Sequence, residues 1–193
     1  MSSLDRIKLY GMSLQMTERE LDSVEGEYKL DLQRLASKSK DRDDEFYPQF
    51  EEAVRREASS MAQHYEIFYC LEKSIRTLIR SKLEAVHGAT WWTTKVPQNV
   101  RDNAEKNMQR EVEAGVSQRS DDPIDYTTFG ELGEIVRANW PDFSDTFNSE
   151  KAFTKIMGSL NLLRGPIAHC SPFAPDEVVR LKLTLRDWFR LME

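Results

Sequence analysis

The stretch NLLRGPIAHC, residues 161–170, joins an apolar helical run to a Gly-Pro pair and places a histidine five residues after an arginine. Proline has no backbone N–H and its ring clashes with the preceding turn, so we expect the helix to end or kink near Gly165. On a straight helix His169 would lie nearly opposite Arg164, whereas a break would let the histidine turn back toward the arginine. The stretch therefore predicts either a capped helix end or a site built on these two side chains.

Helical periodicity extends from this stretch through most of the chain. Apolar residues recur every three or four positions, and no segment alternates in the manner of a strand. Gly88 is expected to end a long helix, and Thr128 to Glu131 has the pattern of a capping box. We expect an all-α fold with about five core helices after residue 60, at about 48–87, 97–115, 128–141, 153–164 and from 175 onward.

The N-terminal part predicts a separate helical arm. Residues 13–37 carry a partial heptad of apolar side chains, and the polar stretch SKSKDRDDE at 37–45 reads as a turn or hinge. Together with the start of the long helix, this segment could form an antiparallel hairpin that mediates oligomerisation or partner docking. We therefore expect two domains, an arm over 1–60 and a helical domain over 61–193.

Composition bounds the function. The chain has 193 residues and a net charge of −6, which argues against a general polyanion-binding protein, so contact with RNA would need a local basic patch. No apolar run is long enough to cross a membrane, and no signal-peptide pattern is present. Cys70 and Cys170 have no metal-binding spacing. We expect a reduced, cytoplasmic protein with no metal, no cofactor and no membrane association.

Two charged side chains fall where apolar ones are expected. At about 100° per residue, Phe68, Ile75 and Ile79 share one side of the long helix, and Glu72 lies within their stripe. Arg164 similarly continues the apolar side of its own helix. A carboxylate that faces a core needs a partner. Glu72 and Arg164 are therefore a candidate pair, either a register-fixing salt bridge or part of a site.

A basic flank lies beside Glu72 on the same helix. Lys73, Arg76 and Arg80 occupy adjacent positions around the helix axis and could line an RNA-binding cleft, although such residues also form ordinary solvated faces. A second basic group lies on the last helix and is open to the same two interpretations. It consists of Arg180, Lys182, Arg186 and Arg190.

An arginine and a histidine brought together at a helix break could cleave RNA without a metal ion. Histidine exchanges protons near neutral pH, while the planar guanidinium of arginine stays charged and fits a phosphate. The histidine would transfer a proton at the 2′-OH or at the leaving oxygen, and the arginine would stabilise charge on the pentacovalent phosphate. A 2′-OH nucleophile restricts this reaction to RNA. The spacing alone also fits a helix cap.

The motif and its surroundings resemble a known family. LLRGPIAHC resembles the RxxxxH signature of the HEPN superfamily, whose usual form is close to LRNPIAHN. Other segments resemble the HEPN subtype named after the C-terminal domain of a nuclear-pore-associated RNA endonuclease, and together they cover roughly 61–193. These segments are FYCLEKSIRTLIRSKL at 68–83, the following WW and VPQNV, and YTTFGELGEIVRANWPDF at 126–143.

The resemblance implies a helical bundle that pairs about a two-fold axis, with the arginine and histidine of both copies in one cleft. By position, Arg164 and His169 would be the catalytic pair, and Glu72 a supporting catalytic residue. Many members of the superfamily are metal-independent RNases, while others are toxins, antiphage effectors or accessory domains. Two positions depart from the usual motif, because Gly165 and Cys170 stand where asparagine is common and remove two hydrogen-bonding groups.

These features predict a HEPN-type, metal-independent endoribonuclease that cleaves single-stranded or loop RNA as a homodimer. The resemblance suggests the setting of a bacterial-style toxin or antiphage-defence system. One alternative is a catalytically silent interaction subunit that dimerises and docks a larger protein partner through residues 1–60, or binds RNA or a nucleotide. Another is a nucleotide-binding pocket that is paired with a nucleotidyltransferase.

Overall fold

The structure, a computed structural model, describes residues 49–193 together with Leu21, Val24, Glu27 and Tyr28, and it divides into two compact units between Glu51 and Glu52. Those four N-terminal residues are helical. The rest of the helix predicted over 13–37 and the turn predicted over 37–45 lie outside the described residues. The arm over 1–60 and its domain boundary stay predictions.

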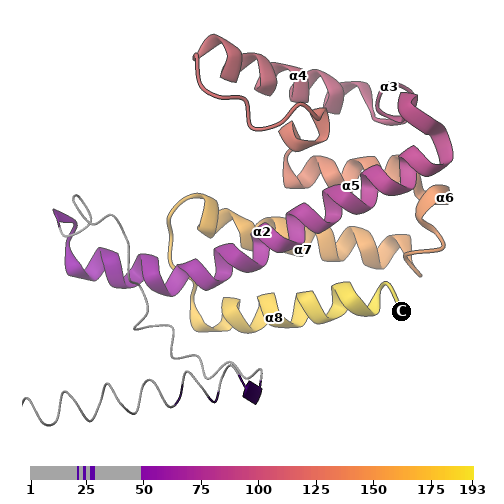
Figure 1. Ribbon diagram of the computed structural model, residues 1–193. Coiled ribbons are helices and arrows are strands. Elements are labelled where there is room, and N and C mark those ends of the chain that lie inside the picture. Colours follow the sequence, from indigo (N-terminus) through magenta and orange to yellow (C-terminus); the bar gives the residue numbers. More distant parts are fainter. Residues whose placement is uncertain (1–20, 22–23, 25–26, 29–48) are drawn as a thin grey trace, which may run out of the picture. The chain divides into compact units, whose positions relative to one another are not determined.

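Residues 52–193 form an all-α bundle, and no strand occurs among the described residues. This confirms the predicted fold class, with five helices of ten or more residues in this unit. Two short α-helices and two 3-10 turns connect them (Figure 1). The elements are α2 (Glu52–His87), η3 (Gly88–Thr90), α3 (Trp91–Lys95), α4 (Gln98–Glu113), η4 (Pro123–Tyr126), α5 (Phe129–Ala138), α6 (Trp140–Phe143), α7 (Glu150–Ala168) and α8 (Pro175–Arg190).

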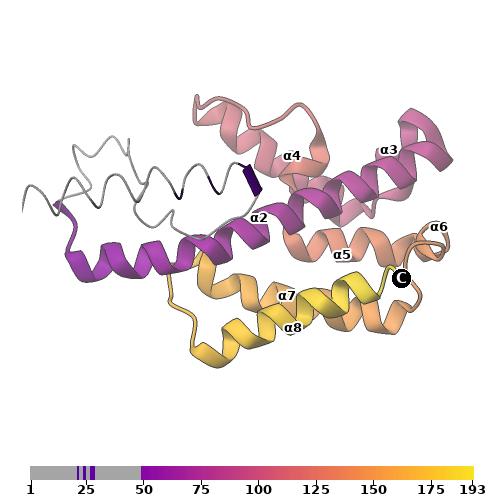
Figure 2. The same ribbon diagram turned by 60° about the horizontal axis from the view of Figure 1, so that its bottom comes forward.

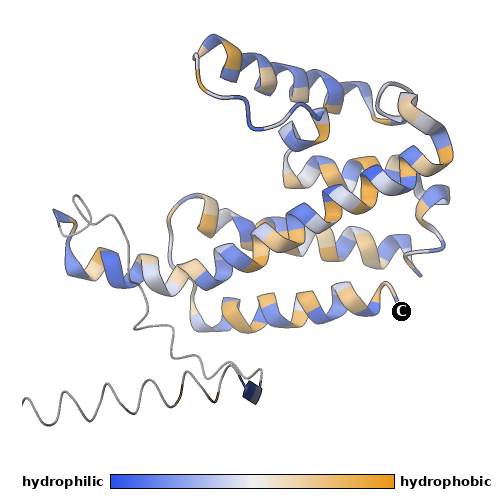
Figure 3. Cartoon of the chain, viewed as in Figure 1, coloured by the Kyte–Doolittle hydropathy of each residue, from blue (hydrophilic) through white to orange (hydrophobic). Residues whose placement is uncertain are grey.

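The long helix α2 is the spine of the bundle. Its 36 residues span about 54 Å at 1.5 Å per residue. Its C-terminal part packs on α5 and α7, and α7 lies beside α8 in both views (Figures 1 and 2). The first turns of α2 extend beyond these helices and are mostly hydrophilic, whereas α8 alternates between apolar and polar bands (Figure 3). The buried side chains of α2 are His64, Phe68, Leu71, Ile75, Ile79 and Leu83.

Local sequence signals set most of the helix boundaries. Gly88 follows α2 with a φ of +65°, a conformation that glycine adopts without steric cost. The predicted capping box is present, because the Thr128 hydroxyl accepts from the Glu131 amide while the Glu131 carboxylate accepts from the Thr128 amide. The helix predicted over 128–141 ends at Ala138, and Pro141 lies in the first turn of α6. This placement suits proline, since the first-turn amides of a helix have no intrahelical partner.

Several apolar side chains that helical spacing places on a buried side are exposed. Val86 shares the angular position of the buried stripe on α2, yet it is exposed because it lies one residue from the end of the helix. Phe189 on α8 and Tyr65 on α2 also follow the apolar spacing of their helices, and both are exposed. The segment after Gly88 contains the short helix α3 and buries Trp91.

The predicted helix break at Pro166 does not occur. Helix α7 continues through Pro166 to Ala168. Gly165 explains this tolerance in part, since it has no Cβ to clash with the following proline ring in the helical conformation. The helix ends instead in a Schellman motif, in which the Ser171 amide donates to the Pro166 carbonyl at 2.8 Å and Cys170 has a φ of +53°.

Candidate functional site

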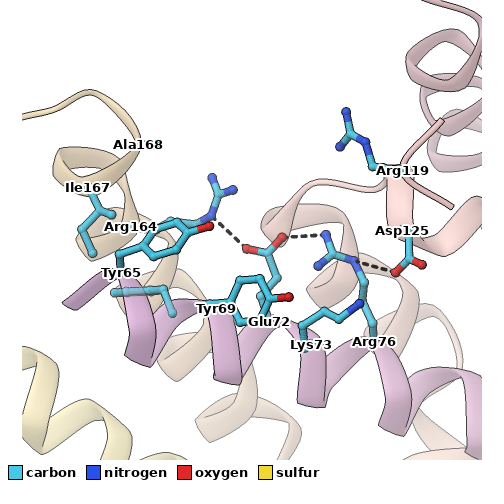
Figure 4. A pocket seen from close by; sticks show the side chains of 11 residues that line it. Tyr65, Tyr69, Glu72, Lys73, Arg76, Arg119, Asp125, Arg164, Ile167 and Ala168 are labelled. Atoms are coloured by element: carbon cyan, nitrogen blue, oxygen red, sulfur yellow. Dashed lines mark hydrogen bonds and ion pairs between the residues drawn. The ribbon is translucent and has the colours of Figure 1, made fainter. Parts of the chain in front are cut away.

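A groove of about 640 Å³ runs along one face of α2, between the end of α7 and the segment that leads into α5. It is the place where Glu72 and Arg164, the two charged residues singled out in the sequence, come together (Figure 4). Four cationic side chains and two carboxylates line it, so it is locally basic in a chain whose net charge is −6. The lining residues are Tyr65, Phe68, Tyr69, Glu72, Lys73, Arg76, Arg119, Asp125, Arg164, Ile167 and Ala168.

Glu72 lies between two guanidinium groups. Its Oε2 accepts a hydrogen bond from Arg164 Nε at 3.0 Å, and its Oε1 accepts one from Arg76 Nη2 at 2.6 Å. The predicted contact between Glu72 and Arg164 is therefore confirmed. The Glu72 side chain is 15% exposed, and the two arginines supply the compensating charge that a largely buried carboxylate needs.

Arg76 connects α2 to the segment before α5. Besides Glu72, its guanidinium donates to the carbonyls of Ile124 at 3.2 Å and Thr127 at 2.8 Å, and it lies 3.9 Å from Asp125. Its side chain is only 11% exposed. Most of its hydrogen-bonding capacity is thus used within the protein, and its role in RNA binding stays a prediction.

The other two residues of the predicted basic flank differ from each other. Arg80 does not line the groove and pairs with Asp122 at 2.5 Å. Lys73 lines the groove, is exposed, and has no hydrogen-bond or ion-pair partner within the part of the chain that the structure describes. Among the three lysine and arginine residues of the flank, Lys73 is therefore the one available to an anionic ligand.

Arg164 is held by one side of its guanidinium only. Its Nε is hydrogen-bonded to Glu72, whereas its terminal nitrogens make no hydrogen bond to any described residue and point away from Glu72 into the open groove (Figure 4). The side chain is 38% exposed. An arginine anchored in this way presents two parallel N–H groups, the arrangement that binds two oxygens of a phosphate.

His169 does not share this groove. It is the C-cap residue of α7, is exposed, and is absent from the groove lining. Because α7 continues through Pro166, five residues at about 100° each turn His169 by about 140° from Arg164 around the helix axis. The expectation that a break at Pro166 returns the histidine to the arginine is wrong.

The groove also contains residues that sequence reasoning missed. Tyr65, Tyr69 and Lys73 recur at intervals of four residues, a spacing that marks one helix face, but the predicted RNA-binding residues included only Lys73 of the three. Arg119 comes from a loop without periodicity, so the sequence carried no signal for it. Arg119 lies over the ring of Tyr126 at 5.1 Å.

The loop that carries Arg119 is tied to α4. Arg119 Nε donates to Glu111 Oε1 at 2.5 Å, and this hydrogen bond lowers the pKa of Glu111. The Tyr126 hydroxyl donates to the Ser120 carbonyl at 2.8 Å.

Within the described residues, no group of three or more His, Cys, Asp or Glu side chains is arranged to hold a metal ion. No helix among them is long and apolar enough to cross a membrane.

Comparison with known proteins identifies the family. The family model described as Swt1-like HEPN matches residues 66–193, which include helices α3 to α8 and most of the groove. Searches of curated proteins and of solved structures find no match. The predicted HEPN membership is confirmed, while the link of the subtype to a nuclear-pore-associated RNA endonuclease stays a prediction. With the match extending over about two thirds of its length, this chain belongs to the Swt1-like HEPN family.

Proposed function

We propose that this chain is a metal-independent endoribonuclease that cleaves single-stranded or loop RNA as a homodimer. The observation that carries the proposal is the state of Arg164, whose Nε is fixed by Glu72 while its terminal nitrogens face an open, locally basic groove. A structural salt bridge alone does not require the phosphate-binding edge of the guanidinium to stay unpaired. Membership of the HEPN family supports the assignment to RNA.

In the proposed reaction the 2′-oxygen attacks the adjacent phosphorus and the bond to the 5′-oxygen breaks. The products are a 2′,3′-cyclic phosphate and a 5′-hydroxyl end. His169 would accept the proton of the 2′-OH or donate one to the leaving oxygen. Arg164 would stabilise the negative charge on the phosphate, and Glu72 would act as the positioning residue for Arg164.

The position of His169 favours a site shared between two copies. Since His169 lies on a different side of α7 from the groove, its own Arg164 is poorly placed to act on the same phosphate. A two-fold arrangement that brings the ends of two α7 helices together would place His169 of a second copy near the groove. We therefore assign the arginine and the histidine of each reaction to different copies.

Mixing two inactive variants tests this proposal. Arg164→Ala and His169→Ala should each abolish cleavage of single-stranded RNA in the presence of a chelator, with the fold retained. Co-refolding the two variants in equal amounts should restore about a quarter of wild-type activity, because half of the dimers would contain one intact composite site of two. Cleavage by His169→Ala at the wild-type rate would overturn the proposal, and no restoration on mixing would overturn the shared site.

The position of His169 also favours the second candidate function, a catalytically silent module that binds RNA in the groove. This alternative predicts RNA binding without cleavage, and it retains docking of a larger partner through residues 1–60. The setting in a toxin or antiphage system is proposed by family analogy alone. The cytoplasmic location is proposed from the cysteine content of the chain.

A further inference from the structure

Two tyrosines lie exposed at the entrance of the groove. Tyr65 and Tyr69 are 59% and 55% exposed, and both line the groove that holds Arg164. Their ring centroids are 6.1 Å apart with the planes tilted by 40°. Figure 4 shows both rings on the groove side of α2, beside Glu72 and Arg164. Neither tyrosine contributes to the core of the bundle.

The two tyrosines lie in line with Lys73, the cation of the groove that has no partner among the described residues. Tyr65, Tyr69 and Lys73 follow one another at intervals of four residues, so they form one ridge of about 12 Å along α2. The first two members offer aromatic faces and the third offers a positive charge with no partner among the described residues. Arg164 adds its terminal nitrogens from the opposite wall.

This combination matches the chemistry of an unpaired nucleic-acid strand. Proteins that bind single strands combine a basic groove, which follows the backbone, with aromatic side chains on which bases stack. A duplex keeps its bases stacked inside the helix and offers no free base face to a tyrosine, whereas loops and single strands do. The ridge thus has the features that distinguish single-stranded RNA from double-stranded RNA.

We propose that Tyr65 and Tyr69 are a stacking platform for unpaired bases, and that this platform selects single-stranded RNA and guides its phosphate toward Arg164. The inference deepens the proposed function and rests on it for the identity of the nucleic acid. Lys73 contacts the backbone at the end of the ridge. The tyrosines act by binding and take no part in the chemical step.

Equilibrium binding tests the platform separately from cleavage. The affinity of the full-length protein is measured by fluorescence anisotropy with a labelled ten-nucleotide single-stranded RNA and with an RNA duplex of the same length. All variants carry His169→Ala, so that the RNA stays intact. Phe189→Ala is the matched control, because Phe189 is 60% exposed on α8 and does not line the groove.

Tyr65→Ala and Tyr69→Ala should each weaken binding of the single strand by about 5- to 150-fold, the range that loss of one aromatic–base stack produces. The corresponding phenylalanine variants should stay within about threefold of the parent, since they keep the ring. Affinity for the duplex and the salt dependence of binding should be unchanged in all four variants, because no charge is removed. Phe189→Ala should bind RNA as the parent does.

Two results would overturn the platform: single-strand affinity that survives both alanine substitutions, or an equal loss of duplex affinity. If the alanine variants bind RNA normally but change from dimer to monomer in light scattering, the tyrosines belong to a protein contact and the proposal is wrong. Absence of cleavage by the wild-type protein, together with tyrosine-dependent binding in the His169→Ala background, would refute the proposed nuclease and leave the platform standing. Normal cleavage by the wild-type protein, together with RNA binding that does not depend on the tyrosines, would refute the platform and leave the proposed nuclease standing.

Discussion

Replacement of Glu72 by glutamine should destabilise the bundle far more than loss of an ordinary surface carboxylate. Glu72 accepts hydrogen bonds from Arg76 and Arg164 through different oxygens. Glutamine has nearly the same volume but only one acceptor oxygen, so either orientation of its amide turns an NH₂ group toward one guanidinium. The substitution also leaves the positive charge of Arg76, which is 11% exposed, without its closest counter-ion.

The magnitude follows from the burial of the three groups. Breaking a fully buried ion pair costs about 3–5 kcal/mol, and an exposed pair is worth about 0–1 kcal/mol. Arg76 keeps its bonds to the carbonyls of Ile124 and Thr127, and Arg164 is 38% exposed. We therefore expect Glu72→Gln to lower the free energy of unfolding by about 2 kcal/mol, an intermediate value. That loss corresponds to a fall in Tm of about 4–8 °C for a domain of this size.

Tryptophan fluorescence during urea unfolding measures this effect on the correct part of the chain, because all four tryptophans lie in the unit 52–193. Asp145→Asn is the matched control. Asp145 accepts from Lys82 at 2.6 Å through both oxygens, but its side chain is 70% exposed. We expect this control to lose less than about 1 kcal/mol. Equal losses for the two variants would refute the reasoning that burial makes Glu72 the central carboxylate of the site.

Three further predictions concern α7, α2 and the groove. Cys170→Gly should raise the free energy of unfolding by about 0.5–1 kcal/mol, because position 170 has a φ of +53° that glycine adopts without steric cost. Cys170→Ala should not raise it, and urea titration of the two variants measures the difference. Burial, and secondarily the charge of Lys182, lowers the pKa of His64 below 6.5. The unfolded chain therefore binds a proton first as the pH falls through 6.5, so the parent should lose stability toward pH 5 relative to His64→Leu, and parallel stability curves would contradict this. Lys73→Ala should reduce the slope of log affinity against log salt for single-stranded RNA by about 0.7, and an unchanged slope would remove Lys73 from the backbone contacts.

Side-chain periodicity was sufficient to predict the bundle and half of the site. The stripe Phe68, Ile75 and Ile79 is buried, and the misplaced charge of Glu72 correctly required a partner on another helix. A charged residue within an apolar stripe is informative because burial without a partner is costly. Arg164, which lies far along the chain from Glu72, is that partner.

Contacts that depend on loops could not be predicted in this way. Arg76 is tied to the carbonyls of Ile124 and Thr127, and no periodicity places a backbone carbonyl of a 3-10 turn beside a helix. The failure at Pro166 has a different origin. Proline usually ends a helix, but the residue before it matters, and Gly165 lacks the Cβ that makes the helical conformation costly at that position.

The same geometry changes the meaning of the two departures from the usual HEPN motif. Asparagine is common where this chain has Cys170, and the structure gives that position a positive φ, which asparagine tolerates better than most residues. A backbone requirement is therefore enough to explain asparagine there, without a hydrogen bond to the reacting groups. Gly165 likewise serves the passage of α7 through Pro166. Neither departure removes Arg164 from Glu72, so the capacity for catalysis depends on what approaches the open side of that guanidinium, and the mixing of Arg164→Ala with His169→Ala measures this directly.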